Sequence, residues 1–189
     1  MKLTDKVIVV TGGAHGIGAA MLRRFHREQP RALVVADRDL PGAEALAAEL
    51  GGLAVACDVS READIVALVV RATRDYGAID LFVSNAGIGL GGGVEAPDDE
   101  WRRIIDINLM AHVWAARAVL PAMVARKSGY LLSTASAAGV LSMVGSAPYS
   151  VTKHAAVALA EWLAISYGDR GIKVSCLCPL YVNTDLLKG

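Results

Sequence analysis

The 189-residue chain is 54% hydrophobic and 20% charged, and its length is sufficient for one domain with a sizeable core. Lys and Arg together number 19, as do Asp and Glu, so the formal net charge is zero. This balance argues against partners that are bound through excess charge, namely nucleic acid and anionic membrane surfaces.

Short β-branched runs alternate with longer helical patterns along the whole chain. Strands are predicted at residues 6–11, 32–36, 53–59, 81–85, 130–134 and 173–178. Helices are predicted at residues 16–29, 41–50, 60–76, 98–127 and 149–168, with Ser60 as an N-cap and a bend or restart at Pro121. This alternation predicts a single α/β domain over residues 1–189, a Rossmann-type doubly wound parallel sheet of about six strands with helices on both faces.

Targeting segments and metal ligands are not evident in the sequence. No stretch reaches about 18 uncharged apolar residues, so no transmembrane span is expected. The apolar run at residues 7–10 is too short for a signal peptide, and a cytoplasmic location is expected. Cys57, Cys176 and Cys178 have no further Cys or His at ligand spacing, which favours buried core thiols and no metal site.

The helices predicted at residues 98–127 and 149–168 are apolar nearly all round. A helix that covers a sheet buries only one face. The second apolar surface therefore favours contact with another subunit, and a thicker core is the alternative. A homodimer or homotetramer through these two helices is predicted.

A glycine cluster, Gly12, Gly16 and Gly18, joins the first predicted strand to the first predicted helix. Glycines let the backbone approach a pyrophosphate, and a helix N-terminus offers free N–H groups and the positive end of its dipole. The position between a strand and a helix is the context that a dinucleotide site requires. We expect His15 and Ile17 of this loop to contact the cofactor as well.

Acidic residues follow the second and third predicted strands. Asp37 can accept hydrogen bonds from ribose hydroxyls and would repel a 2′-phosphate, which favours NAD over NADP. Two alternatives stay open, because Arg38 could bind a 2′-phosphate and Asp37 could simply form a turn. Asp58, next to Val59, is predicted to meet the adenine amine or, alternatively, to mark the entry to the next helix.

Tyr149 and Lys153 are four residues apart, so one face of a helix presents both. A cationic amine beside a phenol favours the phenolate, which general acid–base catalysis near neutral pH requires. Alone, the pair could be a solvated helix face, but the glycine loop makes it far more specific. Ser136 precedes Tyr149 by thirteen residues, and it could also cap a turn.

Together these motifs resemble the short-chain dehydrogenase/reductase family over almost the whole chain. Thr11-Gly-x-x-x-Gly-x-Gly18 resembles its cofactor loop, and the Asn-Ala-Gly signature is matched by Asn85, Ala86 and Gly87. The segment Pro179-x-x-Val182-x-Thr184 resembles the one that holds the nicotinamide carboxamide. The resemblance implies a catalytic tetrad of Asn108, Ser136, Tyr149 and Lys153.

The resemblance also implies the role of each tetrad residue. Tyr149 would be the general acid or base, Lys153 would hold the ribose hydroxyls, and Ser136 would hydrogen-bond the substrate oxygen. Asn108 would anchor a water that links Lys153 to solvent. The expected reaction moves a hydride between NAD(H) and a secondary alcohol or ketone. The alternatives are an NAD-binding sensor or scaffold without catalysis and an NADPH-dependent oxoacyl reductase.

Other features complete the expectations. Leu180 stands where the family has glycine, and family members continue past Thr184 into a substrate lid and a last strand. The sequence ends at Gly189, so we expect it to be C-terminally incomplete, with both segments belonging to a longer natural chain and the strand at 173–178 left as an apolar edge; a partner that covers this edge is the alternative. A substrate cavity is expected from residues 88–94, 137–146 and the segment after Pro179, with a mobile glycine loop. Asn85 is expected to be structural, and His26, His112 and His154 are expected in solvent or loops.

Overall fold

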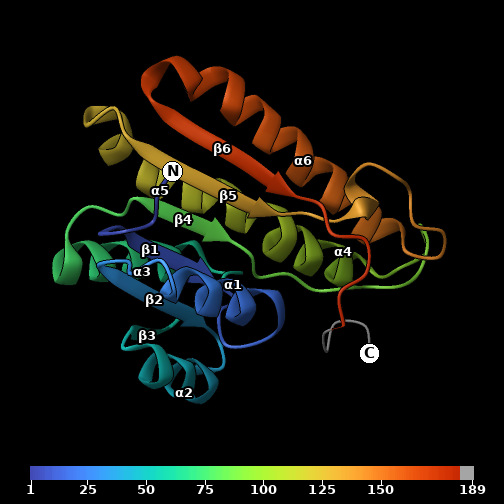
Figure 1. Ribbon diagram of the computed structural model, residues 1–189. Coiled ribbons are helices and arrows are strands. Elements are labelled where there is room, and N and C mark those ends of the chain that lie inside the picture. Colours follow the sequence, from blue (N-terminus) through green and yellow to red (C-terminus); the bar gives the residue numbers. More distant parts are fainter. Residues whose placement is uncertain (184–189) are drawn as a thin grey trace.

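The computed structural model describes residues 1–183, and its framework is one parallel sheet with the strand order β3-β2-β1-β4-β5-β6 (Figure 1). The strands are β1 (Val7–Thr11), β2 (Ala32–Asp37), β3 (Leu53–Ala56), β4 (Leu81–Ser84), β5 (Gly129–Thr134) and β6 (Ile172–Leu177). All five neighbouring pairs are parallel. The prediction of a doubly wound α/β domain with about six strands is confirmed.

Helices cover both faces of this sheet. The α-helices are α1 (Gly16–His26), α2 (Leu40–Leu50), α3 (Glu62–Tyr76), α4 (Asp98–Ile105), α5 (Ala111–Ala125) and α6 (Ala147–Tyr167). Three short elements join them: a π-turn η1 (Asp106–Met110) and the 3₁₀ turns η2 (Ala137–Gly139) and η3 (Gly168–Arg170).

The core has two halves because successive side chains of a strand point to opposite faces. In β1, Val7 and Val9 pack in one buried cluster with residues of α3, α5 and α6. Ile8 and Val10 pack in the other cluster with residues of α1 and α2. This arrangement explains the continuous apolar runs, since a parallel strand covered on both faces has no solvent side. The carboxyl ends of the strands are left free to carry a site.

The long helix predicted at 98–127 is irregular at a different place from the one expected. Helices α4 and α5 form one stretch from Asp98 to Ala125, and its irregularity is the π-turn η1. Pro121 lies on an exposed face within α5 and does not end it. By length and composition alone this stretch could cross a membrane, and half of its apolar window is buried in the fold.

The predicted N-cap at Ser60 is wrong. Helix α3 begins at Glu62, and Ser60 instead donates both its backbone N–H and its hydroxyl to the Asp58 carboxylate. Such local side-chain bonds compete with helix formation. Strand β6 lies at the sheet edge and, among the described strands, pairs with β5 alone.

Candidate active site

The glycine loop packs tightly against the Asn-Ala-Gly segment. Gly12 has a φ of +62°, and a Cβ there would lie 2.8 Å from the Cα of Ala86. A Cβ on Gly18 would lie 2.1 Å from the carbonyl oxygen of Gly12. Only glycine meets these demands without moving the backbone. The loop therefore leads into α1 with its backbone exposed to the adjoining cavity, and no side chain caps the first turn of α1.

Asn85 ties three strand ends together. Its Nδ2 donates to the carbonyls of Thr11 and Gly12 at 3.0 and 3.1 Å, and its Oδ1 accepts from the Thr134 hydroxyl at 3.1 Å. All its side-chain polar atoms are thus engaged in holding the glycine loop on β1, β4 and β5. These contacts agree with the structural role predicted for Asn85.

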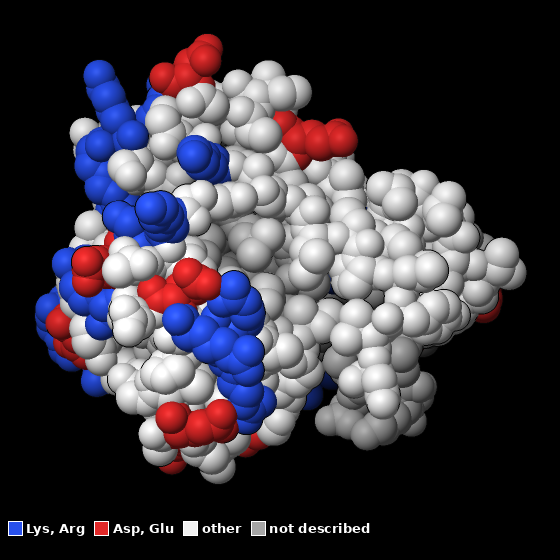
Figure 2. All heavy atoms as spheres, in the orientation of Figure 1, with Lys and Arg blue, Asp and Glu red and all other residues white. Residues whose placement is uncertain are grey.

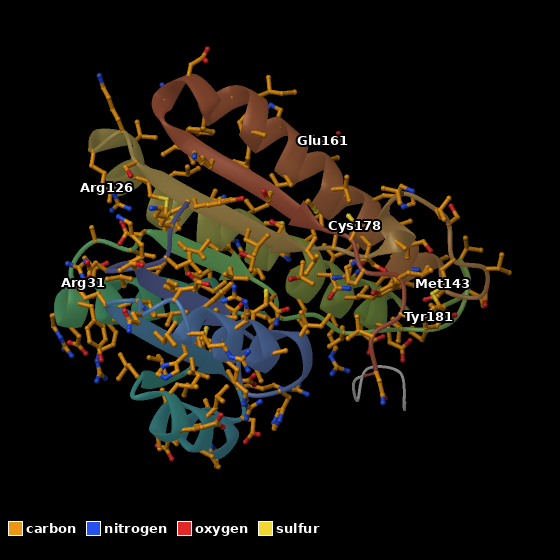
Figure 3. The ribbon with its side chains drawn as sticks, viewed as in Figure 1. Arg31, Arg126, Met143, Glu161, Cys178 and Tyr181 are labelled. Carbon is orange, nitrogen blue, oxygen red and sulfur yellow. The ribbon has the colours of Figure 1, made fainter. Side chains whose placement is uncertain are left out.

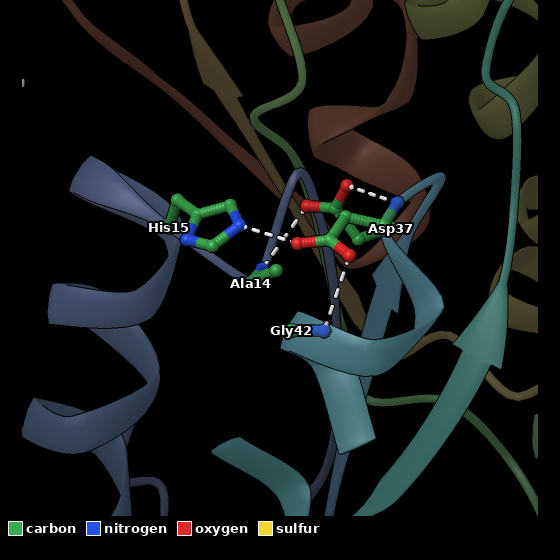
Figure 4. A network of polar contacts seen from close by, with 5 residues as sticks. Ala14, His15, Asp37 and Gly42 are labelled. Carbon is green, nitrogen blue, oxygen red and sulfur yellow. Dashed lines mark hydrogen bonds and ion pairs between the residues drawn. The ribbon is translucent and has the colours of Figure 1, made fainter. Parts of the chain in front are cut away.

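Asp37 and Asp39 form a polar network at the mouth of the glycine loop (Figure 4). The Asp37 carboxylate accepts from the backbone N–H groups of Ala14 and Asp39, each at 3.0 Å. His15 Nε2 lies 2.6 Å from Asp39 Oδ2, and Asp39 also accepts from the N–H of Gly42. The His15 contact is the main reason that the pKa of Asp39 is lowered. Asp37 thus forms the turn considered as the alternative and also lines the cavity.

Asp58 combines the two roles considered for it. Its carboxylate accepts from Ser60, which lowers the pKa of Asp58, and its backbone N–H donates to Asp64 at 3.1 Å. These bonds organise the entry to α3. Asp58 and Val59 nevertheless both line the cavity beside the glycine loop.

This first cavity has a volume of about 540 Å³ and runs along the carboxyl edge of the sheet. The predicted cofactor residues that line it are Gly12, His15, Gly16, Ile17, Asp37, Asp58, Val59, Asn85, Ala86, Gly87, Tyr149, Lys153, Pro179 and Val182. Gly18 instead packs behind the loop, and Thr184 lies outside the described residues. The glycine loop, the uncapped N-terminus of α1 and the carboxylates of Asp37 and Asp58 fit a dinucleotide.

Lys153 and Tyr149 project from the first turns of α6. Lys153 Nζ lies 5.6 Å from the centre of the Tyr149 ring and donates to the Thr134 carbonyl at 3.1 Å. Lys153 is only 4% exposed, and burial lowers its pKa from the usual 10.5 to about 8. Its side chain is therefore still mostly cationic at neutral pH, within reach of the phenol.

Ser136 caps the turn η2, where its Oγ accepts from the N–H of Ala138 at 3.1 Å. The capping role considered as an alternative is thus present. Ser136 also lines the first cavity together with Tyr149, and both residues line a second cavity. Capping fixes the position of the hydroxyl between the two spaces and leaves it accessible to a ligand.

Asn108 lies in the π-turn and is fully buried. Its Oδ1 accepts from the N–H of Ile88, and its Nδ2 donates to the Ile88 carbonyl, both at 2.9 Å. A Cβ on Gly87 would lie 3.2 Å from Asn108 Oδ1 and 3.3 Å from Lys153 Nζ. Asn108 and Lys153 of the predicted tetrad therefore meet at Gly87, and Ser136 and Tyr149 line the same cavity as Gly87.

The second cavity has a volume of about 810 Å³ and adjoins the first. It is lined by residues from the predicted segments 88–94 and 137–146 and by Leu180 and Tyr181. Met143 and Tyr181 lie at the same end of the molecule (Figure 3). Sequence reasoning missed Glu100 and Arg103 of α4, which also line it; their charge on a polar helix face gave no signal of a site.

The glycine loop of this cavity, predicted to be mobile, is fastened to the facing segment. Gly92 donates to the carbonyl of Gly145, and Ala147 donates to the carbonyl of Gly92, both at 2.9 Å. Ser146 donates its hydroxyl to the carbonyl of Leu90. These bonds close one wall of the cavity.

The prediction that His112 lies in solvent or a loop is wrong. His112 is 3% exposed within α5, and neither ring nitrogen has a hydrogen-bond partner among the described residues. Cys57 is buried as predicted, which raises its pKa to about 12, whereas Cys176 and Cys178 are only half-buried. Within residues 1–183, no group of three or more His, Cys, Asp or Glu side chains could hold a metal ion.

Comparison with known proteins decides the family. The family model described as short chain dehydrogenase matches residues 6–189. The chain belongs to the short-chain dehydrogenase/reductase family. It is 39% identical to the oxidoreductase UcpA of Escherichia coli (strain K12), over 100% of this chain and 73% of UcpA. It is 33% identical to the mitochondrial borneol dehydrogenase of Lavandula x intermedia, over 99% of this chain and 73% of that protein.

Solved structures of the family agree with the fold. A 3-ketoacyl-(acyl-carrier-protein) reductase from Brucella melitensis, complexed with NADH, superposes with a TM-score of 0.94 at 34% identity, over 98% of this chain and 80% of that one. A short-chain dehydrogenase/reductase from Burkholderia phymatum in complex with NAD gives a TM-score of 0.95 at 30% identity, over 100% and 70%. The chain is therefore an oxidoreductase of this family, and it spans about three quarters of the length of these relatives.

Proposed function

We propose that this chain transfers a hydride between NAD(H) and a secondary alcohol or ketone, with Tyr149 as the general acid or base. One observation carries the proposal: the two cavities share Ile88, Ser136, Tyr149 and Leu180. A dinucleotide in the first cavity and a substrate in the second would meet at the Ser136 hydroxyl and the Tyr149 phenol. A binding protein without catalysis would not need this junction.

The protein groups at the junction have complementary tasks. When bound, the nicotinamide would supply the hydride chemistry. Ser136 would hydrogen-bond the substrate oxygen while Tyr149 gives or takes the proton there. The Lys153 ammonium would stabilise the phenolate and reach the ribose, since it uses one N–H on Thr134 and has two more to offer.

An apolar substrate fits the second cavity best. Leu141, Met143 and Tyr181, which line it, are each more than half exposed. On the face drawn in Figure 2, few charged side chains lie over the side that residues 137–146 occupy in Figure 1. The relative named borneol dehydrogenase supports an alcohol or ketone substrate.

NAD is the cofactor that the Asp37 carboxylate favours. The Asp37 carboxylate lines the first cavity, where it would accept bonds from ribose hydroxyls and repel a 2′-phosphate. Arg38 also lines this cavity, which keeps NADP as the second candidate. Fluorescence titration with NADH and NADPH separates the two, and a strong preference for NADPH would overturn the assignment.

The decisive experiment replaces Tyr149 with Phe and measures turnover on a panel of secondary alcohols and ketones. Loss of the general acid or base should lower kcat about 10²–10⁴-fold. Tyr167→Phe, in the last turn of the same helix, is the matched control and should keep its activity. Unchanged turnover in Tyr149→Phe would remove this residue from the mechanism. Tight NADH binding by the wild type without turnover on the panel would favour a non-catalytic binder.

We also propose that the chain self-associates through the predicted helices 98–127 and 149–168. On α6, Val151, Trp162 and Ile165 are each more than half exposed and lie on one helix face. No large apolar residue is similarly exposed between Asp98 and Ala125, so the α6 face gives the stronger support. Light scattering of the wild type and of Trp162→Glu tests this; a monomeric wild type would refute it.

A further inference from the structure

His112 is a buried polar group that the mechanism above does not use. It lies in the first turn of α5, directly after the π-turn, and both ring nitrogens lack a partner within residues 1–183. Leaving a buried polar group without a hydrogen bond costs about 1–3 kcal/mol, so such groups usually bind ordered water when no protein atom is available. The geometry of His112 therefore calls for a non-protein partner.

The position of His112 places it beside the predicted tetrad. It follows Asn108 by four residues, one helical turn farther along the side that faces α6. Helix α6 packs against the π-turn, and the Lys153 ammonium is near enough to lower the pKa of His112 further. The ring is thus close enough to Lys153 for the ammonium to affect its protonation.

The protonation state of His112 suits it to hold water. Burial lowers its pKa to about 3, so the imidazole is neutral at physiological pH. A neutral imidazole has one N–H donor and one acceptor nitrogen, which allows it to bind a water at each side. By contrast, Asn108 uses both N–H groups of Nδ2, on Ile88 and Thr152, and cannot donate to a further water.

We propose that His112 is a positioning residue whose two unpaired ring nitrogens, four residues after Asn108 and near Lys153, hold buried waters that supply protons to the Lys153–Tyr149 pair. This rests on the proposed function. After Tyr149 gives its proton to the substrate oxygen, the phenolate must regain one from solvent. Waters fixed between His112 and Lys153 pass that proton inward, each releasing one proton as it takes another. His112 stays neutral and orients the waters.

Nuclear magnetic resonance tests the water contact without any turnover. Protein labelled with ¹⁵N-histidine is compared with His112→Phe, which assigns the His112 ring signals. We expect one neutral tautomer down to about pH 5, with cross-relaxation between the ring N–H and water. A ring without contact to water, or one that becomes an imidazolium near pH 6, would overturn the proposal. This readout stands even if no alcohol or ketone is turned over, so the two proposals fail separately.

Kinetics test the positioning role. His112→Phe fills the same space without polar atoms, and His112→Gln keeps a donor and an acceptor. We expect kcat to fall about tenfold in the Phe variant, with a larger solvent isotope effect, and to recover in the Gln variant. His26→Gln, exposed on α1, is the control. Two results would refute the role, with variants that fold and keep the wild-type melting temperature. One is an unchanged kcat and isotope effect in His112→Phe. The other is a kcat in His112→Gln that is no higher than in His112→Phe.

Discussion

Asn108 holds the backbone of Ile88 at both polar groups, accepting its N–H and donating to its carbonyl at 2.9 Å each. Ile88 lines both cavities, so this pair connects the π-turn with the junction where the two spaces meet. Strand β4 ends at Ser84, so the hydrogen bonds of the Ile88 backbone come from the Asn108 amide and not from a neighbouring strand. The segment after β4 is thereby fixed without being part of the sheet.

Removing the Asn108 amide is expected to loosen this segment. In Asn108→Ala, two backbone groups of Ile88 lose their partner, and each buried unsatisfied group costs about 1–3 kcal/mol. Urea denaturation should show this loss, and KM for the substrate should rise. Thr152→Ala leaves both bonds to Ile88 in place; it removes the weaker 3.3 Å contact to Nδ2 and the hydroxyl's bonds to the carbonyls of Pro148 and Tyr149, and it serves as the milder comparison. Wild-type stability in Asn108→Ala would contradict the assignment.

Lys153 makes the stability of the cofactor-free protein depend on pH. Its pKa is about 8 in the folded chain, against the usual 10.5. Between these two values the unfolded chain binds more protons, so the free energy of unfolding rises with pH across this window. Below pH 8 the buried ammonium destabilises the fold in full.

The corresponding test uses Lys153→Met, which has no such titration. The stability of the wild type relative to this variant should increase by about 3 kcal/mol from pH 7 to pH 10.5. Thermal or urea unfolding at several pH values measures the difference, and Lys173→Met, exposed on β6, should show no such trend. If the difference in the free energy of unfolding between wild type and Lys153→Met did not change with pH, the pKa of Lys153 would not be lowered in the folded chain. Lys153→Met should also lose its catalytic activity.

The framework and most of the candidate site could be predicted from the sequence because local signals and sheet geometry agree. Glycine at Gly12 and the Tyr149–Lys153 spacing depend on short-range chemistry, and the carboxyl ends of parallel strands then bring their loops together. The continuous apolar runs of the strands likewise need no tertiary information beyond burial on both faces.

Other features depend on contacts between distant segments. The π-turn forms where Asn108 reaches Ile88, and hydrophobic periodicity carries no record of that bond. Ser60 is a residue type that favours N-caps, but its hydroxyl donates to the Asp58 carboxylate and does not cap α3. His112 did carry a signal, since it lies one turn from Asn108 and is flanked by apolar neighbours, which places it on a buried face.

Asp37 is expected to control the choice of cofactor. Asp37→Ser removes the negative charge and keeps at most one of the bonds to Ala14 and Asp39. Relief of a like-charge contact with a 2′-phosphate, roughly 1–4 kcal/mol, should improve NADPH affinity relative to NADH at least about tenfold. Fluorescence titration of both cofactors gives the ratio. Asp39→Ser, whose carboxylate binds His15 and Gly42, is the control, and an equal shift in both variants would refute a specific role for Asp37.

Gly139 sets the distance between η2 and α6, and therefore between Ser136 and Tyr149. A Cβ at Gly139 would lie 2.6 Å from the carbonyl oxygen of Lys153, so Gly139→Ala must push α6 away from η2. Overpacking of this kind costs about 1–3 kcal/mol, and the displaced tyrosine should lower kcat more than it changes cofactor affinity. Gly168→Ala, at the other end of α6 with open space around it, should be neutral or slightly stabilising. Unfolding curves and steady-state kinetics of both variants decide the matter, and equal behaviour would show that close packing at Gly139 does not position the catalytic pair.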